Sequence, residues 1–343
     1  MLRQGDELTP TTYDIPDEVF KFSGQTCLET WSLRDQVNLT AYAFYSKWLV
    51  QELHLTMQRI RDLADAFPFY QRRKDTGRPP VSERDLMVCF LVRQVFNATF
   101  RQTQGLLAHL ADYFQIDEIP DHTVLSRYNR SQRWLRIWQR FHDFIMAILP
   151  KRRVVIATDA TGFSGRKRPW REWPHAAKAN QDWVKMHTAI ETDTFYILSY
   201  RLTESNVHDS QMFGQVWEHL PSNVEPMMSL ADSAYHGNEI LEKAQSYGAW
   251  PLHGIKKNAV YRRSPINAYQ RMAQFIFKFP KTYSAFYGKR NHAEAAFSML
   301  GNRFGYRLRS RSKIGRKNEV QSKVVCHNIR MLAWNYLKGS NGV

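Results

Sequence analysis

The sequence predicts an α/β protein in which a mixed sheet flanked by helices follows a mainly helical N-terminal region. Apolar residues recur at helical spacing over much of the first 149 residues. After Pro150 the pattern changes to short runs rich in β-branched and aromatic residues, and helical segments then alternate with such runs. We therefore expect a helical region, residues 1–150, followed by a sheet-containing domain, residues 151–338.

Five helices are expected in the N-terminal region, after an irregular arm at residues 1–30. Ser82 and Asp121 are placed to cap two of them, because their side chains can accept hydrogen bonds from the free amides of a helix start. The predicted helices span residues 39–67, 82–96, 103–114, a short segment after Asp121 that carries Ser126, Arg127, Arg130 and Arg133, and 134–149. Such a module could read DNA or could serve packing or dimerisation, and both alternatives stay open.

Beyond Pro150, three successive strands are predicted to pair antiparallel, and helices and strands then alternate. The predicted strands span residues 153–160, 183–192, 195–203, 226–232 and 250–256, and the predicted helices span 209–220 and 238–248. In the loop after the first strand, Trp170, Trp173 and Trp183 flank basic residues. That loop suits either stacking on nucleic-acid bases or the packing of a hairpin.

The charge balance favours a polyanionic partner. Lys and Arg number 48 against 32 Asp and Glu, which gives a formal net charge of +16, and nucleic acid is the leading candidate. No stretch reaches the roughly 18 uninterrupted apolar residues of a membrane span, and the first residues lack the apolar core of a secretory signal. We expect a cytoplasmic protein with no membrane partner.

Two carboxylates stand at the ends of predicted strands. Asp159 follows the apolar run VVIA and Asp232 follows MMSLA, although Asp is a poor strand former. A buried, unpaired carboxylate costs free energy that a bound Mg²⁺ or Mn²⁺ would relieve. Alternatively, each Asp caps the turn that follows it.

A third acid lies on a predicted helix. At about 100° per residue, Tyr287, Arg290 and Glu294 fall within one arc of about 60°, so one helix face would carry a phenol, a guanidinium and a carboxylate. The simpler interpretation is an i,i+4 salt bridge between Arg290 and Glu294.

The order of these motifs resembles the DDE transposases of prokaryotic insertion sequences. The motifs are Asp159-Ala160-Thr161, then Asp232-Ser233-Ala234-Tyr235, then Tyr287, Arg290 and Glu294. Lys185 and His187, the segment 205–210 and the segment 120–128 also agree, and the resemblance covers about residues 80–335. One departure is Gly301, where the longer family pattern has a lysine; Arg303 and Arg307, in the basic run that follows, could contact phosphate in its place.

The resemblance implies a ribonuclease-H-like fold, with the two Asp residues on neighbouring strands and the Glu on a helix that crosses them. Asp159, Asp232 and Glu294 would be the catalytic residues and would hold Mg²⁺ or Mn²⁺, with two ions expected. Tyr287, Arg290 and Lys185 would contact the DNA phosphates, and His187 and His236 are further candidates for the site. The spacing of these histidines matches no common zinc pattern.

The implied function is transposition. Water would cleave DNA at the element ends, and the freed 3′ hydroxyl would then join target DNA, so the expected partner is double-stranded DNA, both terminal repeats and target. A homodimer that associates with the nucleoid is expected. The alternatives are a hydrolytic nuclease of the same fold and a domesticated or inactive DNA-binding protein.

Overall fold

The computed structural model describes residues 41–70, 80–165, 183–256, 259–260 and 262–340. The predicted N-terminal arm, most of the loop at residues 68–80, and Trp170 and Trp173 lie outside the described residues, whereas Trp183 begins the second strand. The N-terminal helices are α2 (Ala41–Ala66), α3 (Glu83–Val95), α4 (Phe100–Phe114), α5 (His122–Asn129) and α6 (Gln132–Ala147). All five predicted helices are therefore present.

Side-chain caps explain where these helices begin. Ser82 Oγ accepts from the amide of Asp85, and Asp121 Oδ1 accepts from the amide of Thr123, both as predicted. The prediction for α4 was three residues short, because Thr99 and Gln102 form a reciprocal capping box that starts the helix at Phe100. Arg133, expected on the short helix, lies instead on α6.

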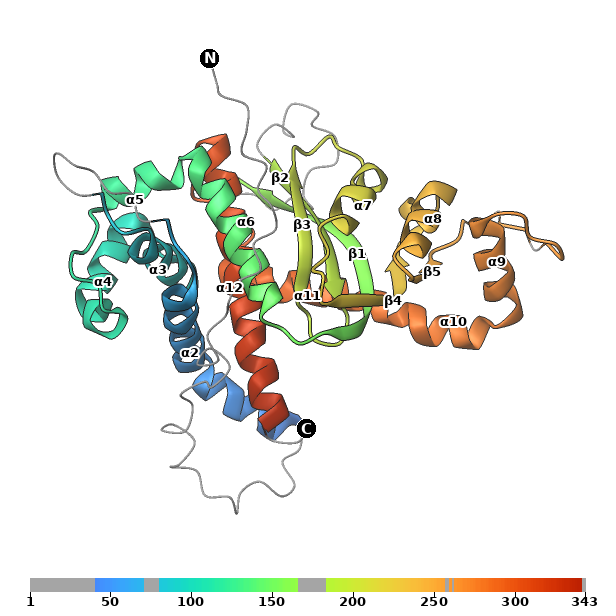
Figure 1. Ribbon diagram of the computed structural model, residues 1–343, viewed down its shortest axis with the longest axis horizontal. Helices are drawn as coiled ribbons and strands as arrows, with labels where there is room; N and C mark the ends of the chain where they lie inside the picture. The colour runs from blue at the N-terminus through green and yellow to red at the C-terminus, as the bar shows by residue number, and fades with distance from the viewer. Residues whose placement is uncertain (1–40, 71–79, 166–182, 257–258, 261, 341–343) are drawn as a thin grey trace.

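A five-stranded mixed sheet forms the centre of the second part of the chain (Figure 1). Its strands are β1 (Arg152–Ser164), β2 (Trp183–Glu191), β3 (Ile197–Thr203), β4 (Val224–Ala231) and β5 (Trp250–His253). The spatial order is β3-β2-β1-β4-β5, and β1, β2 and β3 pair antiparallel as predicted. β4 pairs parallel to β1, and β5 pairs parallel to β4.

Helices cover both faces of this sheet, which completes the ribonuclease-H-like fold. The remaining helices are α7 (Asp209–Trp217), the short η5 (Ser233–Tyr235), α8 (Asn238–Ser246), α9 (Ala268–Lys278), α10 (Pro280–Tyr287), the short η6 (Gly288–Arg290), α11 (Asn291–Phe304) and α12 (Lys313–Ser340). Successive strand residues face opposite sides, so Thr158, which accepts from Trp217 of α7, and Phe163, which lies under Lys323 of α12, mark the two faces of β1. The helix predicted to start at Asp209 ends three residues earlier than expected.

The basic segment after α11 leads into α12, which is largely buried. α12 lies between the N-terminal helices and the sheet and packs against α2, α3 and α6 (Figure 1). Its buried face carries polar and charged side chains alongside apolar ones: Asn318, Glu319, Gln321, Ser322, Lys323, His327 and Asn328. Several of these side chains have partners far away in the sequence. Local composition alone therefore predicts, wrongly, that they are exposed to solvent.

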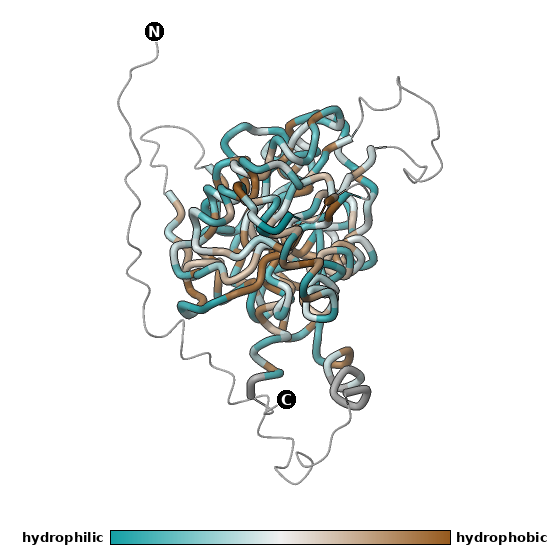
Figure 2. The backbone as a smooth tube through the Cα atoms, turned by 90° about the vertical axis from the view of Figure 1, so that its right-hand side faces the viewer, coloured by the Kyte–Doolittle hydropathy of each residue, from teal (hydrophilic) through white to brown (hydrophobic). Residues whose placement is uncertain are grey.

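One hydrophobic core runs through both parts of the chain. It includes residues from Met57 of α2 to Leu332 of α12, together with the inner residues of the sheet. Figure 2 shows the hydrophobic segments running through the middle of the molecule. The functional division at residue 150 stays a prediction. None of the described helices is both long and apolar enough to cross a membrane.

Candidate active site

Asp159 lies on the central strand β1, at the level where the neighbouring strand β4 ends. Its backbone pairs with Thr188 of β2, and its Oδ1 accepts from the amide of Ala160 at 2.8 Å. The side chain is 21% exposed. Burial raises the pKa of Asp159 to about 6, although the Ala160 amide and Arg290 oppose the shift; the charges of Asp232 and Glu294 add to it.

Asp232 follows β4 directly and caps the turn after it. Because β4 is the parallel neighbour of β1 and Ala231 pairs with Thr158, Asp232 reaches the same edge of the sheet as Asp159. Its Oδ1 accepts from the amide of Ala234 at 2.8 Å. Asp232 therefore also caps the turn, as the alternative interpretation predicted. This hydrogen bond uses Oδ1 and leaves Oδ2 available to a ligand.

Tyr287, Arg290 and Glu294 do not share one continuous α-helix, which corrects the prediction. Tyr287 ends α10, Arg290 ends the 3₁₀ turn η6, and Glu294 lies in the first turn of α11. The side chains of all three residues nevertheless line the same cavity. Arg290 Nη2 donates to Glu294 Oε1 at 2.8 Å, so the simple salt bridge is present, and Arg290 Nη1 lies 3.6 Å from Asp159 Oδ2.

A single open cavity of about 520 Å³ collects five of the predicted residues. They are Asp159, Asp232, Tyr287, Arg290 and Glu294. The cavity therefore joins residues from two neighbouring strands and the start of a helix, which is the arrangement the family resemblance implies for the three acids.

Sequence reasoning missed three further residues that line the cavity, Gly254, Ile255 and Tyr283, and named Ser233 only as part of the second motif. Gly254 follows β5, and a Cβ there would stand 2.8 Å from both Tyr287 Oη and the amide nitrogen of Ser233. Tyr283 stacks on Tyr287 with ring centroids 4.9 Å apart. A glycine just after a strand could have signalled a close backbone approach.

Behind this cavity, His253 holds the turn of Asp232 against the sheet. The side chain is completely buried, with Nδ1 2.8 Å from the carbonyl of Tyr235 and Nε2 2.8 Å from Ser229 Oγ. Burial lowers the pKa of His253 to about 4, so the ring is neutral: Nδ1–H donates to Tyr235 and Nε2 accepts from Ser229. Nothing in the local sequence pointed to this role.

The cavity offers carboxylate oxygens, the donors that hard divalent cations prefer. Within the described residues, no three His, Cys, Asp or Glu side chains stand close enough together to form a metal site, because Glu294 turns toward Arg290. The donor atoms of Asp159, Asp232 and Glu294 are nevertheless of the type that suits a divalent cation, and all three side chains line the same cavity.

The other predicted residues lie outside this cavity. Lys185 and His187 of β2 both approach Asp209 Oδ1, at 2.7 and 3.3 Å, and so attach the start of α7 to the sheet. His236 donates from Nδ1 to the carbonyl of Ser233 at 2.7 Å. Arg303 pairs with Glu52 of α2 at 3.1 Å, and Arg307 lines a different cavity. Whether these five contact DNA or act in catalysis stays a prediction.

The departure at Gly301 has a steric reason. The ring of Tyr306 lies where a Cβ at residue 301 would be, and Tyr306 Oη donates to the carbonyl of Phe297 at 2.8 Å. A lysine at position 301 would overlap this ring. The chain therefore uses that position for the packing of Tyr306.

Comparison with known proteins agrees with this geometry. The model of the family described as transposase DDE domain matches residues 150–329, which is more than half of the chain. Among solved structures, the chain resembles a piggyBac transposase synaptic complex with hairpin DNA, seen by cryo-EM, at 10% identity and a TM-score of 0.43, over 85% of this chain and 74% of that one. A likeness this weak supports no inference about the present chain. On the strength of the family match, this chain belongs to the transposase DDE domain family.

Proposed function

We propose that this transposase cleaves DNA at the ends of its element and joins the freed ends to target DNA, with divalent metal held by Asp159, Asp232 and Glu294. The observation that carries the proposal is the single cavity in which these three acids meet Tyr287 and Arg290. Mg²⁺ or Mn²⁺, in two sites, would activate the attacking oxygen and stabilise the departing one.

Two phosphoryl transfers of the same type make up the reaction. Water attacks a phosphorus atom at the element end, the bond to the 3′ oxygen breaks, and a 3′ hydroxyl and a 5′ phosphate result. That 3′ hydroxyl then attacks a target phosphorus atom and displaces the target's own 3′ oxygen. No covalent bond to the protein is required.

Arg290 would stabilise the phosphoryl group. Its guanidinium already lies between two acids of the cavity, at 2.8 Å from Glu294 and 3.6 Å from Asp159. A guanidinium can form paired hydrogen bonds to phosphate oxygens and stabilise the charge that develops there. Tyr287, stacked on Tyr283, would support the same phosphate through its hydroxyl.

The test is cleavage of labelled duplexes that carry the element ends found in the flanking genomic sequence, with Mg²⁺ or Mn²⁺. Asp159→Asn, Asp232→Asn and Glu294→Gln should each lower the rate by about 10³-fold or more, because groups that act as a unit fail together. Glu239→Gln, an exposed acid on α8, is the matched control and should cleave normally.

Each alternative function has its own result in this assay. A nuclease would cleave the ends but would not join a pre-cleaved 3′ end to a target plasmid. An inactive DNA-binding protein would retain the labelled ends uncut at every metal concentration. Two element ends call for two active sites, so we also propose a homodimer, which light scattering of the DNA complex would detect as twice the chain mass.

A further inference from the structure

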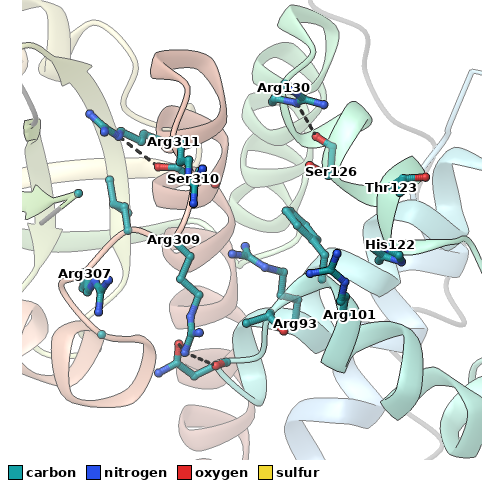
Figure 3. A pocket seen from close by; sticks show the side chains of 17 residues that line it. Arg93, Arg101, His122, Thr123, Ser126, Arg130, Arg307, Arg309, Ser310 and Arg311 are labelled. Atoms are coloured by element: carbon teal, nitrogen blue, oxygen red, sulfur yellow. Dashed lines mark hydrogen bonds between the residues drawn. The ribbon is translucent and has the colours of Figure 1, made fainter. Parts of the chain in front are cut away.

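A second cavity, of about 930 Å³, lies between the N-terminal helices and the segment that follows α11 (Figure 3). Arg93, Arg101 and Arg130 line it from the N-terminal side, and four more arginines line it from within residues 307–316. No Asp or Glu is among its described lining residues, and it shares no lining residue with the active-site cavity. We call it the arginine cleft.

Four of these arginines have no carboxylate partner among the described residues. Arg101, Arg130, Arg307 and Arg311 are exposed, and none of them pairs with a carboxylate in the described part of the chain. Like charges gathered on facing walls repel one another, and an anion between them removes this repulsion. The composition of the arginine cleft therefore indicates an anionic ligand.

Residues 305–311 form one wall of the cleft, and we call this segment the strap. Hydrogen bonds to β1 and α12 hold it in place. The strap pairs with the end of β1, since Ser164 donates to the carbonyl of Tyr306 at 3.1 Å and Leu308 donates to the carbonyl of Ser164 at 2.8 Å. Glu319 of α12 accepts from the amides of Arg309 and Ser310 at 3.0 and 2.9 Å. The strap is thus held in one conformation before any ligand binds.

Direct contacts also join the two walls at the base of the cleft. Arg93, 3% exposed, lies 3.6 Å from Glu319, and Arg309 donates to the carbonyl of Asn97 at 2.8 Å. Asn129 of α5 donates to Ser310 Oγ at 3.0 Å. These contacts hold the two walls at a fixed separation, so a ligand can bind without rearrangement of the backbone and only the exposed arginine side chains need to be ordered.

We infer that the arginine cleft binds the sugar–phosphate backbone of DNA, apart from the active site and without reading bases. Guanidinium forks match phosphate oxygens, and backbone contacts position a protein on DNA without carrying sequence information. The inference rests on the proposed function, since it names where a DNA transposase grips its substrate. It assigns Arg101, Arg130, Arg307 and Arg311 to this contact.

Salt dependence of binding tests this inference. The triple variant Arg101→Gln, Arg130→Gln, Arg311→Gln removes three free charges from the cleft. Fluorescence anisotropy with labelled duplex and EDTA, from 50 to 200 mM KCl, should show the slope of log K against log[salt] becoming shallower by about 2–3, because each lost phosphate contact changes it by about 0.9. The change should be equal for element-end and unrelated duplexes.

A matched triple variant, Arg136→Gln, Arg153→Gln, Arg271→Gln, removes the same charge from exposed arginines that do not line the cleft. Its slope should equal that of the native protein. An unchanged slope in the cleft variant, or an equal change in both variants, overturns the inference. If the triple variant unfolds, Arg101→Gln alone should still change the slope by about 0.9.

Two further arms separate the possible causes. If 10 mM inorganic phosphate raises the Tm of the native protein but not of the cleft variant, and the DNA slope is unchanged, the cleft is a small-anion site and the inference fails. Asp159→Asn should keep the native slope while losing cleavage. Binding without metal is measured independently of catalysis, so a failure of the proposed cleavage activity leaves this test intact.

Discussion

At the scale of single residues, Gly254 is the least replaceable position at the edge of the active site. A Cβ there would press on Tyr287 Oη and on the Ser233 amide, both at 2.8 Å, and would lie 3.2 Å from the carbonyl carbon of Asp232. Two of these atoms belong to the backbone, which cannot rotate away. A movement that relieves these close contacts would therefore displace either Asp232 or Tyr287.

We therefore expect Gly254→Ala to lower metal-dependent cleavage by about 10–100-fold, since a misplacement near 1 Å can cost about 10²-fold. The Tm should fall modestly, because the close contacts are confined to the rim of an open cavity. Gly214→Ala on α7 is the control, because a Cβ there meets nothing within 4 Å. Normal cleavage by Gly254→Ala would show that the close approach has no catalytic importance.

At the scale of elements, α12 depends on one buried carboxylate. Burial alone would raise the pKa of Glu319, but the charges of Arg93 and Lys323 and the hydrogen bonds from Arg309 and Ser310 hold it below its usual value. Glu319→Gln keeps an acceptor for the strap amides and leaves the two cations uncompensated.

Glu319→Gln should lower the free energy of unfolding by about 3–5 kcal/mol, as is typical when one partner of a buried ion pair is removed. Urea unfolding followed by circular dichroism would measure this loss. Glu204→Gln, which breaks the exposed pair with Lys313 at 3.0 Å, should leave the free energy of unfolding nearly unchanged, because solvent screens this pair. Similar losses in both variants would contradict the importance of the buried network.

Elements were predictable from the sequence where local signals decide them. The runs VVIA and MMSLA placed β1 and β4, with Asp159 on the first and Asp232 directly after the second. That these two strands are neighbours was implied by the family resemblance. The break between α10 and α11 was not predictable, because Gly288 keeps helical backbone angles and only the turn type changes. The buried face of α12 was missed because Glu319 and Lys323 find partners only in the folded chain.

At the scale of the whole molecule, two buried histidines set the response to acid. His327 donates from Nε2 to the carbonyl of Phe195 at 2.9 Å, and within the described structure its Nδ1 has no hydrogen-bond partner. Burial lowers the pKa of both His327 and His253 to about 4, whereas an unfolded histidine has a value near 6.5. The unfolded chain therefore binds more protons between pH 6.5 and pH 4, and stability falls as pH falls through this window.

Asp159 acts in the opposite direction. Its pKa of about 6 in the folded chain exceeds the ordinary aspartate value of 3.8, so the folded chain gains a proton first and stability rises as pH falls from 6 to about 4. Two histidines outweigh one aspartate, and a shift of one pKa unit corresponds to about 1.4 kcal/mol. We expect a net loss of about 3 kcal/mol between pH 7 and pH 4.5, measured by urea unfolding.

His327→Gln should flatten this profile, because the variant has only one of the two titrating rings. An equally steep profile in His327→Gln would assign the acid sensitivity to other groups. His236→Gln is the matched control, since His236 lies on the turn outside the core and should leave the profile unchanged.

Under the proposed function, the bridging guanidinium of Arg290 would make the binding of metal and of DNA cooperative. The Arg290 guanidinium contacts two carboxylates at the same time, those of Asp159 and Glu294. A divalent ion held by these carboxylates would release the guanidinium to a phosphate group, and a phosphate that attracted the guanidinium would equally free the carboxylates for metal. By thermodynamic linkage each ligand must then raise the affinity for the other by the same factor. The chain would thus hold its metal weakly until DNA is in place, which protects other DNA from stray cleavage.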